Sequence, residues 1–403
     1  MSAMKPFKNL IDFEKAKKII MENTKEMERK ERINILDAEG RVLAASIKAG
    51  IDVPGFRRAA MDGYAVIAED TFGASRINPK RLRLIGKVFA GKRADVRVKK
   101  GTCIQISTGA PMPEGADAVV IVEETSKEGS NINVYKPVYP DANVSAPDSD
   151  IRQGDEILAE CTILTPPKIG VLAALGLDEV EVYSRPKVKI YPTGDEIVPP
   201  GKGLDYGKIY DINSYTLATL LKSMGADVYV NDITGDTKEE LESCIDEAMD
   251  SDYAIFSGGS SVGERDLLAE IIAKKGELLF HGIAVKPGKP TIFGLVDSTM
   301  VFGMPGYPTS CLTNAYVLLV PSIRKMARLP LNVKREEVVL SHDIVSTVGR
   351  YQIYTVRVAE GVAYPAFKES GAITSMSMAS GYIEIPANTE FIEKGSRVVV
   401  NYF

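Results

Sequence analysis

The stretch Tyr253-Ala-Ile-Phe-Ser-Gly-Gly-Ser-Ser-Val-Gly263, followed by Glu264-Arg265-Asp266, decides the fold of the largest α/β region. Four apolar residues of a predicted buried strand run into a Gly/Ser turn, and the turn opens a helix. Exposed backbone N–H groups and the helix dipole make such a turn suited to bind phosphate. A plain structural turn explains a Gly-rich stretch about as often, so the stretch predicts a fold before it predicts a function.

Strand and helix patterns alternate on both sides of this stretch, from residue 187 to residue 328. Apolar runs at 188–191, 228–233, 253–256 and 300–302 predict strands. Amphipathic segments predict helices at 214–224, at 266–275, and from Thr237, which forms a capping box with Glu240. This alternation is typical of a largely parallel, doubly wound α/β sheet, whose functional site lies beyond the carboxyl ends of its strands.

The rest of the chain predicts further regions. Residues 8–48 have helical periodicity with Asp12 as N-cap, and 167–175 predict a helix that Gly176 ends. Short β-type runs separated by Gly and Pro predict a β-rich insert, and alternating runs such as 351–358 and 397–402 predict a small β-barrel or sandwich. The predicted domains are an elongated helical or mixed domain (1–48 with 152–185), the β-rich insert (49–151), a doubly wound α/β domain (186–329) and a C-terminal β-barrel (330–403).

Composition excludes several classes of protein. The chain has 403 residues, 45% apolar and 26% charged, which is typical of a folded protein of about two to four domains. A net charge of −5 argues against a nucleic-acid or anionic-membrane partner. The chain has no stretch of about 18 apolar residues and its first 20 residues lack a signal-peptide core, which predicts a cytoplasmic protein without a membrane span.

Cysteine and histidine are scarce. The four cysteines, at positions 103, 161, 244 and 311, have no CxxC spacing, and we expect buried free thiols rather than a zinc site or a disulfide framework. His281 and His342 are the only histidines, which argues against a Ser-His-Asp triad or a multi-histidine metal site. A metal bound here would be a hard cation with oxygen ligands.

Charged residues follow several of the predicted strands. Lys286 and Lys289 lie in the rigid turn Val285-Lys-Pro-Gly-Lys-Pro290, where they could contact an anion at small entropic cost. Glu196, Asp236 and Asp266 follow other strands and could serve Mg²⁺, which takes one or two carboxylates with phosphate oxygens and water. A role as helix cap or turn residue explains each single acid equally well.

Six strings occur along the chain in the order of one family: AMDGYAV (60–66), STGAPMPEGADAVV (107–120), PTGDE (192–196), SGGSSVGERD (257–266), KPGKP (286–290) and PGYP (305–308). Residues 143–151, 370–375 and 381–386 add further matches. Together they resemble the MoeA family of molybdopterin molybdenumtransferases, which includes the E domain of gephyrin. The resemblance covers nearly the whole chain.

This resemblance implies a fold and an activity. The fold is an elongated domain with a β-rich insert, a MogA-like doubly wound pterin-binding domain and a C-terminal β-barrel. The implied assembly is a homodimer, whose cleft pairs the pterin-binding domain of one subunit with the insert of the other. The implied reaction inserts molybdate or tungstate into adenylylated molybdopterin, requires Mg²⁺ and releases AMP, and the molybdopterin adenylyltransferase would be a further partner.

The resemblance also assigns roles to residues. Lys286 and Lys289 would attract molybdate or phosphate, and Arg350 would join them from the barrel. Pro305 and Pro308 would shape the pterin pocket. The pterin phosphate would be held by Ser257, Gly258, Gly259, Ser260, Ser261 and Gly263. The catalytic residues would come from two regions. The insert would contribute Asp62, Thr108 and Asp150. The α/β domain would contribute Glu196, Asp236 and Asp266, which would also bind Mg²⁺.

Three departures from the family pattern leave open which oxyanion is used, molybdate or tungstate. Tyr307 stands where the family commonly has the asparagine of PGNP, Ser145 stands where an arginine is common, and Asp148-Ser149 replace Gly-Glu. Two other functions compete with insertion. A molybdopterin adenylyltransferase would turn over ATP without molybdate, and a non-catalytic molybdopterin-binding scaffold would bind cofactor without molybdate-dependent AMP release.

Overall fold

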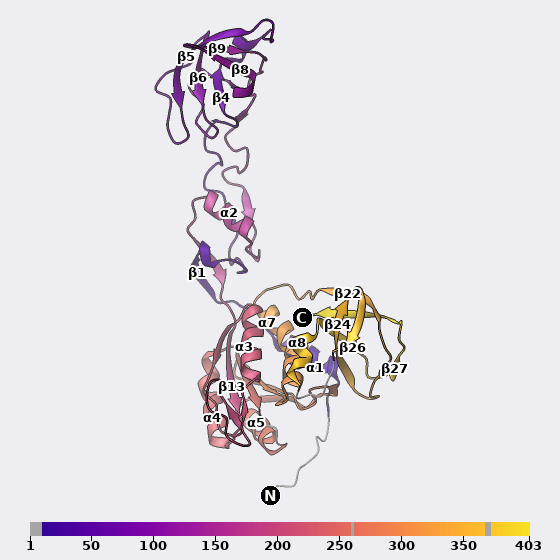
Figure 1. Ribbon diagram of the computed structural model, residues 1–403. Helices are drawn as coiled ribbons and strands as arrows, with labels where there is room; N and C mark the ends of the chain where they lie inside the picture. Colours follow the sequence, from indigo (N-terminus) through magenta and orange to yellow (C-terminus); the bar gives the residue numbers. More distant parts are fainter. Residues whose placement is uncertain (1–9, 259–261, 367–371) are drawn as a thin grey trace. The chain divides into compact units, whose positions relative to one another are not determined.

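The computed structural model describes residues 10–258, 262–366 and 372–403, and the chain forms two compact units (Figure 1). The α/β–barrel unit comprises residues 1–31, 40–42 and 182–403, and the insert unit comprises residues 32–39 and 43–181. These units are coarser than the four predicted domains, whose boundaries stay a prediction. Within the described ranges, none of the helices has the length and apolar character that a bilayer crossing requires.

A six-stranded sheet forms the centre of the α/β–barrel unit, in the order β16-β13-β17-β21-β20-β18. Its parallel strands are β13 (Lys187–Thr193), β16 (Asp227–Val230), β17 (Tyr253–Gly258) and β21 (Thr299–Met304). The antiparallel strands β20 (Ile292–Val296) and β18 (Glu277–His281) complete one edge. The predicted doubly wound sheet is therefore confirmed.

Helices cover both faces of this sheet. Ala254 and Phe256 of β17 pack in one core cluster with residues of α4 (Lys238–Glu247) and α5 (Val262–Lys275). Side chains alternate along a strand, so Tyr253 points to the other face, where its hydroxyl lies 2.7 Å from Ser322 Oγ of α7 (Val320–Met326). Helices α3 (Asn213–Ser223) and α6 (Pro308–Asn314) belong to the same region and contact each other.

The helix caps predicted from the sequence are confirmed, but the predicted start of one helix is wrong. The capping box of Thr237 and Glu240 is formed at the start of α4, and Asp12 accepts from Lys15 N at the start of α1 (Phe13–Asn23). Helix α5 begins at Val262 rather than near Asp266, so Asp266 lies inside the helix instead of capping it.

The C-terminal region forms a closed barrel, as predicted. Five strands follow one another in the order β24-β25-β22-β28-β26, and pairing between β26 and β24 closes the ring. Their bounds are β22 (Arg335–Leu340), β24 (Tyr351–Ala359), β25 (Val362–Pro365), β26 (Gly381–Ile385) and β28 (Arg397–Tyr402). The short strands β23 (Ile344–Val345) and β27 (Phe391–Ile392) pair beside it, and α8 (Ile373–Met378) contacts both α6 and β24.

One short strand of the α/β region belongs to the sheet of the barrel. Strand β19 (Val285–Lys286) runs parallel to the start of β24, with Val285 opposite Tyr351 and Lys286 opposite Gln352. The N–H of Tyr351 donates to the carbonyl of Ala284 at 2.9 Å. The two folds of this unit are therefore joined by backbone hydrogen bonds.

The insert unit is built on a second six-stranded sheet, β7-β4-β6-β5-β9-β8, and is β-rich as predicted. Tyr64 and Val66 of β4 pack on one face of the sheet, and Ala65 packs on the other. The strands of the sheet are β4 (Gly63–Val66), β5 (Lys80–Val88), β6 (Thr102–Ile106), β7 (Ala118–Ile121), β8 (Thr125–Glu128) and β9 (Asn131–Val134).

Short paired strands and one helix complete the insert unit. Strand β3 (Arg58–Ala59) pairs with β10 (Val144–Ser145), and β2 (Ile47–Lys48) pairs with β11 (Glu156–Leu158). Helix α2 (Pro166–Ala174) is followed by Gly176, whose φ of 76° provides the predicted helix stop. The chain passes between the two units in β1 (Lys30–Asn34) and again in β12 (Glu179–Tyr183). These two strands pair with each other in a two-stranded sheet.

Two further predictions from the sequence were wrong. The helix expected over residues 8–48 ends at Asn23, and Thr24 then donates its hydroxyl to Ile20 O at 2.8 Å. Beyond it the chain forms β1, a mostly exposed strand whose partner β12 lies far along the sequence, so local periodicity could not reveal it. The four cysteines form no disulfide, as expected, but Cys161 is exposed rather than buried.

Candidate functional site

A cavity of about 920 Å³ lies in the α/β–barrel unit, a size typical of small-molecule sites. Residues that follow β13 and β21 line it, together with Gly258 at the end of β17. Strand β19 and the barrel residue Arg350 contribute the remaining wall. The cavity is therefore at the carboxyl ends of parallel strands, where ligands bind in open α/β sheets.

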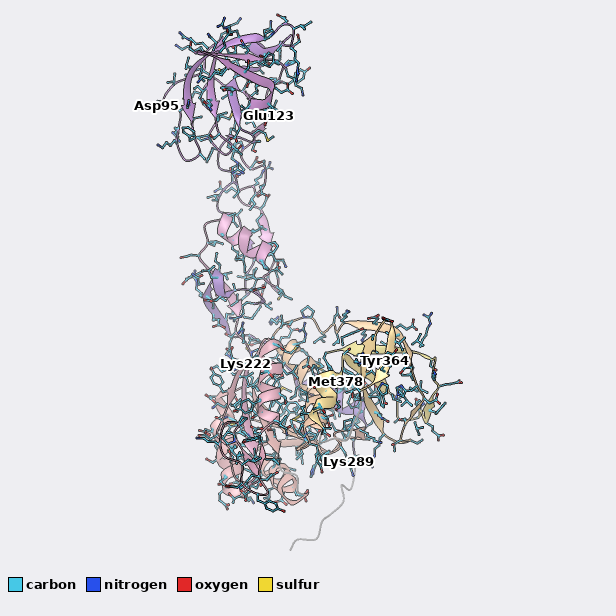
Figure 2. All side chains as sticks on the ribbon, viewed as in Figure 1. Asp95, Glu123, Lys222, Lys289, Tyr364 and Met378 are labelled. Carbon is cyan, nitrogen blue, oxygen red and sulfur yellow. The ribbon has the colours of Figure 1, made fainter. Side chains whose placement is uncertain are left out.

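Seven of the candidate site residues line this one cavity. They are Glu196, Gly258, Lys286, Lys289, Pro305, Pro308 and Arg350. Figure 2 labels Lys289, which lies below Met378 of α8 in that view. Glu196 and Arg350, more than 150 positions apart in sequence, thus line the same cavity.

Other candidates of the same unit are not part of the cavity wall. Ser257 is buried, and its hydroxyl has no hydrogen-bond partner. Asp266 on α5 lies with Oδ1 3.8 Å from His281 Nε2. Asp236 is half-buried two residues beyond Thr234, which forms a bridge to Thr193 at the end of β13. Gly259, Ser260 and Ser261 lie outside the described residues, and Gly263 is in the first turn of α5.

Glycine is required at the end of β17. Gly258 has a φ of 139°, and a Cβ added there would lie 1.8 Å from the carbonyl oxygen of Thr193. A side chain would separate the ends of β17 and β13, which are Cα partners at these two residues. The glycine thus allows the two strands to stay paired up to the cavity.

The lysine-bearing turn is held by a buried asparagine. Asn314 Nδ2 donates to Gly288 O at 2.9 Å and to Thr291 Oγ1 at 2.7 Å. A Cβ on Gly288 would lie 2.3 Å from the same Nδ2, so the turn rests directly on this side chain. Lys286 Nζ donates to Thr347 Oγ1 at 3.2 Å, which directs it toward the barrel.

The turn after β21 is fixed in a similar way. Asn213 Nδ2 donates to Gly306 O at 2.9 Å, and Pro308 occupies the first turn of α6 with Tyr307 as N-cap residue. The carboxylate of Asp211 accepts from Ser214 N at 3.1 Å and from the Ser214 hydroxyl, which secures the start of α3. Both ends of the cavity wall are thus held by buried polar side chains of nearby helices.

The charges that line the cavity favour an anion. Lys286, Lys289 and Arg350 are three cations, against the two carboxylates of Glu196 and Asp211. Asp211 already accepts two hydrogen bonds from Ser214, which leaves Glu196 as the carboxylate that a bound cation could reach. A phosphate or another oxyanion would therefore gain attraction here, especially where the walls exclude water.

The donor set can be compared with the needs of Mg²⁺. Among the residues that the structure describes, no group of three or more His, Cys, Asp or Glu side chains is arranged to hold a metal ion. Mg²⁺ does not need such a cage, because one or two carboxylates suffice when phosphate oxygens and water complete its octahedron. Glu196 beside three cations that would hold phosphate fits that kind of site.

Several wall residues were missed in the sequence. The segment between β13 and α3 adds Leu204, Ile209, Tyr210 and Asp211 to the cavity, and α3 adds its first residue, Asn213. Part of it forms the short parallel pair β14 (Ile197–Val198) and β15 (Ile209–Tyr210). Apolar residues in a Gly-rich loop were the local signal in the sequence, and they fit neither a helical nor a strand period.

The candidates of the insert unit form a group of their own. Asp62 accepts from Thr108 N at 2.7 Å and from Thr108 Oγ1 at 3.0 Å. Asp150 is exposed, and its N–H donates to Val53 O at 3.0 Å. Arg58 lies directly opposite Ser145 in the β3–β10 pair, so an exposed cation adjoins the position where the family pattern has one.

The buried cysteines are unsuited to nucleophilic catalysis. Burial raises the pKa of the Cys103 thiol from 9.0 to about 12, and it also raises the pKa of Cys244 and of Cys311. A neutral thiol is a poor nucleophile. The cavity offers charge and fixed geometry instead, and both can promote a reaction without a covalent intermediate.

Comparison with known proteins gives matches along the whole chain. Three family models match in order: the MoeA N-terminal region (domain I and II) at residues 11–176, a probable molybdopterin binding domain at 189–325, and the MoeA C-terminal region (domain IV) at 337–403. A protein of Methanocaldococcus jannaschii assigned to molybdopterin biosynthesis is 36% identical, over 98% of this chain and 99% of its own. A molybdopterin molybdenumtransferase of Haemophilus influenzae is 37% identical, over 73% of this chain and 72% of its own.

A solved structure agrees with these matches. The crystal structure of the molybdopterin biosynthesis MoeA protein from Pyrococcus horikosii has a TM-score of 0.83 and 39% identity, covering 98% of this chain and 99% of that one. Sequence and fold therefore point to the same relatives.

Proposed function

The chain belongs to the MoeA family, and from this premise we propose that it is a molybdopterin molybdenumtransferase that inserts molybdate or tungstate into adenylylated molybdopterin and releases AMP. One observation carries the proposal. Lys286, Lys289 and Arg350 line one cavity with Glu196, so phosphate and oxyanion attraction is combined with a carboxylate that can serve Mg²⁺.

The chain's residues would act by neutralising and orienting two ligands that repel each other. Lys286 and Lys289 on the turn held by Asn314, with Arg350 from the barrel, attract molybdate and the phosphates of the pterin ligand. Ser257, Gly258, Gly259, Ser260, Ser261 and Gly263 surround the pterin phosphate, and Pro305 and Pro308 shape the pterin wall. Holding both anions in one fixed place lowers the barrier by proximity and electrostatics.

Glu196, Asp236 and Asp266 are the residues that would hold Mg²⁺. A bound Mg²⁺ would supply positive charge beside the phosphate groups of the ligand. Glu196 is already at the cavity, and Asp236 follows a segment that bridges to the end of β13. Asp266 lies in α5, the helix that follows β17.

We further propose a homodimer in the cytoplasm. In it the insert unit of one subunit presents Asp62, Thr108 and Asp150 to the cavity of the other. Asp62 and Thr108 are exposed and bonded to each other, which is suitable for a surface that completes a site on a partner. The enzyme that adenylylates molybdopterin is the natural donor of the substrate.

AMP release tests the proposal. Purified protein is incubated with adenylylated molybdopterin and Mg²⁺ while the oxyanion is varied among molybdate, tungstate and none. We expect AMP only when an oxyanion is present, and the preferred oxyanion identifies the physiological one. ATP turnover without molybdate would instead identify an adenylyltransferase, and pterin binding without AMP release would identify a scaffold.

The Asp266→Ala variant tests the metal assignment in the same assay. We expect it to abolish AMP release while the variant keeps the oligomeric state of the parent. Normal turnover by this variant would exclude Asp266 from the metal site.

A further inference from the structure

We propose that Tyr307 and Tyr210 form an aromatic rim on this cavity, which stacks on the bicyclic heteroaromatic ring of the adenylylated ligand. The inference deepens the proposed function and rests on it for the identity of the ligand. It assigns Tyr307 a specificity-determining role at the position where the chain departs from the family pattern.

The rim consists of large apolar side chains that are exposed although they line a cavity. Tyr307 is 65% exposed and Tyr210 is 39% exposed. Leu204 and Ile209, from the same loop as Tyr210, are 51% and 56% exposed. A cavity wall with this much uncovered apolar and aromatic surface loses contact with water when a flat ring covers it.

Both tyrosines are on backbones that are already fixed. Tyr307 stands between Gly306, whose carbonyl accepts from Asn213, and Pro308 in the first turn of α6. Tyr210 lies in the β14–β15 pair, and its hydroxyl donates to Lys202 O at 2.9 Å. A ring held in this way loses little freedom when a ligand binds, so more of the stacking energy appears as affinity.

The charges of the cavity restrict the kind of ring that fits. Lys286, Lys289 and Arg350 line the same cavity as the rim, so the ligand must carry an anionic group attached to its flat ring. A nucleoside monophosphate and a pterin phosphate share that chemistry, and every such ring has a π-face that stacks on tyrosine. The two halves of adenylylated molybdopterin are the sources that the experiment must separate.

Binding of three probes to the purified full-length protein tests the rim, measured by calorimetry. AMP presents adenine with phosphate, neopterin monophosphate presents a pterin with phosphate, and ribose 5-phosphate presents the phosphate and sugar alone. We compare Tyr307→Ala and Tyr307→Leu, which remove the ring, with Tyr307→Phe, which keeps it. Tyr210→Ala and Tyr210→Phe repeat the comparison on the other element.

We expect Tyr307→Ala and Tyr307→Leu to weaken binding of the stacked probe by about tenfold or more, with Tyr307→Phe close to the parent. Affinity for ribose 5-phosphate should be unchanged in all variants. A loss confined to AMP identifies adenine as the stacked ring, and a loss confined to the pterin probe identifies the pterin.

Two results would overturn the rim. One is a Tyr307→Ala variant whose affinity for ribose 5-phosphate falls as much as its affinity for AMP and neopterin monophosphate, because such a loss indicates general damage to the cavity. The other is unchanged affinity for both ringed probes in Tyr307→Ala. Neither result depends on oxyanion-dependent AMP release by the parent protein, so failure of the rim and failure of the proposed activity are separate outcomes.

Discussion

Gly258 lies directly against Thr193 at the point where two parallel strands of the central sheet end. A Cβ on Gly258 would be 1.8 Å from the Thr193 carbonyl oxygen, far inside any permitted contact. Because Gly258 also lines the cavity, the same close approach that keeps β13 and β17 paired brings backbone to the cavity wall.

We predict that Gly258→Ala destabilises the protein. The variant combines a steric clash with a φ of 139° that side chains rarely adopt, at a cost of about 2 kcal/mol or more. A fall in melting temperature of roughly 4–8 °C is expected in differential scanning calorimetry. Gly203→Ala is the matched control, since a Cβ there meets nothing within 4 Å, and its melting temperature should not fall. Equal behaviour of the two variants would contradict the packing argument.

Removing the charge of Lys286 should weaken the binding of molybdate during turnover. We predict that Lys286→Met raises the KM for molybdate by about tenfold or more, because charge-assisted hydrogen bonds contribute about 1.5–3 kcal/mol. Lys222→Met is the control, since Lys222 is an exposed lysine of α3 and lies well apart from Lys289 in Figure 2. Steady-state AMP release against molybdate concentration measures both. An unchanged KM in Lys286→Met would remove this lysine from the oxyanion site.

Mixing two impaired variants, at a molybdate concentration well below the KM of Lys286→Met, tests whether the site is shared between subunits. Asp62→Ala changes the insert unit, and Lys286→Met changes the cavity of the α/β–barrel unit. If each site takes Asp62 from one subunit and Lys286 from the other, a mixed dimer keeps one intact site. Co-refolded or co-expressed variants should then regain roughly a quarter of the parental AMP release after random pairing. No recovery, with mixed dimers demonstrated by differential tags, would place both residues in one subunit's site or outside it.

Thiol labelling should separate Cys161 from the other three cysteines. At pH 8 we expect fast reaction of one thiol per native chain, which Cys161→Ser abolishes, because Cys161 alone is exposed. Raising the pH to 10 should still leave Cys103 unlabelled. With its pKa raised from 9.0 to about 12, that thiol is about 1% ionised at pH 10, against about 90% for an ordinary thiol. Rapid labelling of Cys103 in folded protein at pH 10 would contradict its burial.

Features that depend on neighbours in sequence were predictable. The capping box of Thr237 and Glu240 involves residues three apart, and Gly176 ends a helix by its own backbone freedom. The apolar strands of the central sheet are buried on both faces, so their sequence alone identifies them. The predicted strand at 228–233 nevertheless ends at Val230, since Asn231 and Thr234 hydrogen-bond to the neighbouring segments as loop residues.

Features that depend on distant partners were not predictable. Strand β1 is exposed and exists through its pairing with β12, which no window of sequence contains. The wall residues Leu204, Ile209 and Tyr210 belong to a loop without periodicity, and their location follows from the β14–β15 pair. Glu196 after β13 and Pro305 after β21 could be anticipated, because parallel strands bring their carboxyl ends to one edge. The same reasoning singled out Asp236 and Asp266, which do not line the cavity.

The pairing of β19 with β24 has a consequence for how this protein can be divided or recombined. Lys286 of β19 lies opposite Gln352 of β24, and Arg350 lies just before β24. Both cations of the cavity wall are therefore positioned by the backbone pairing between β19 and the barrel. The C-terminal region is thus no interchangeable module: a chimera that replaced it would need to match this ladder, residue for residue, to keep the electrostatics of the pocket.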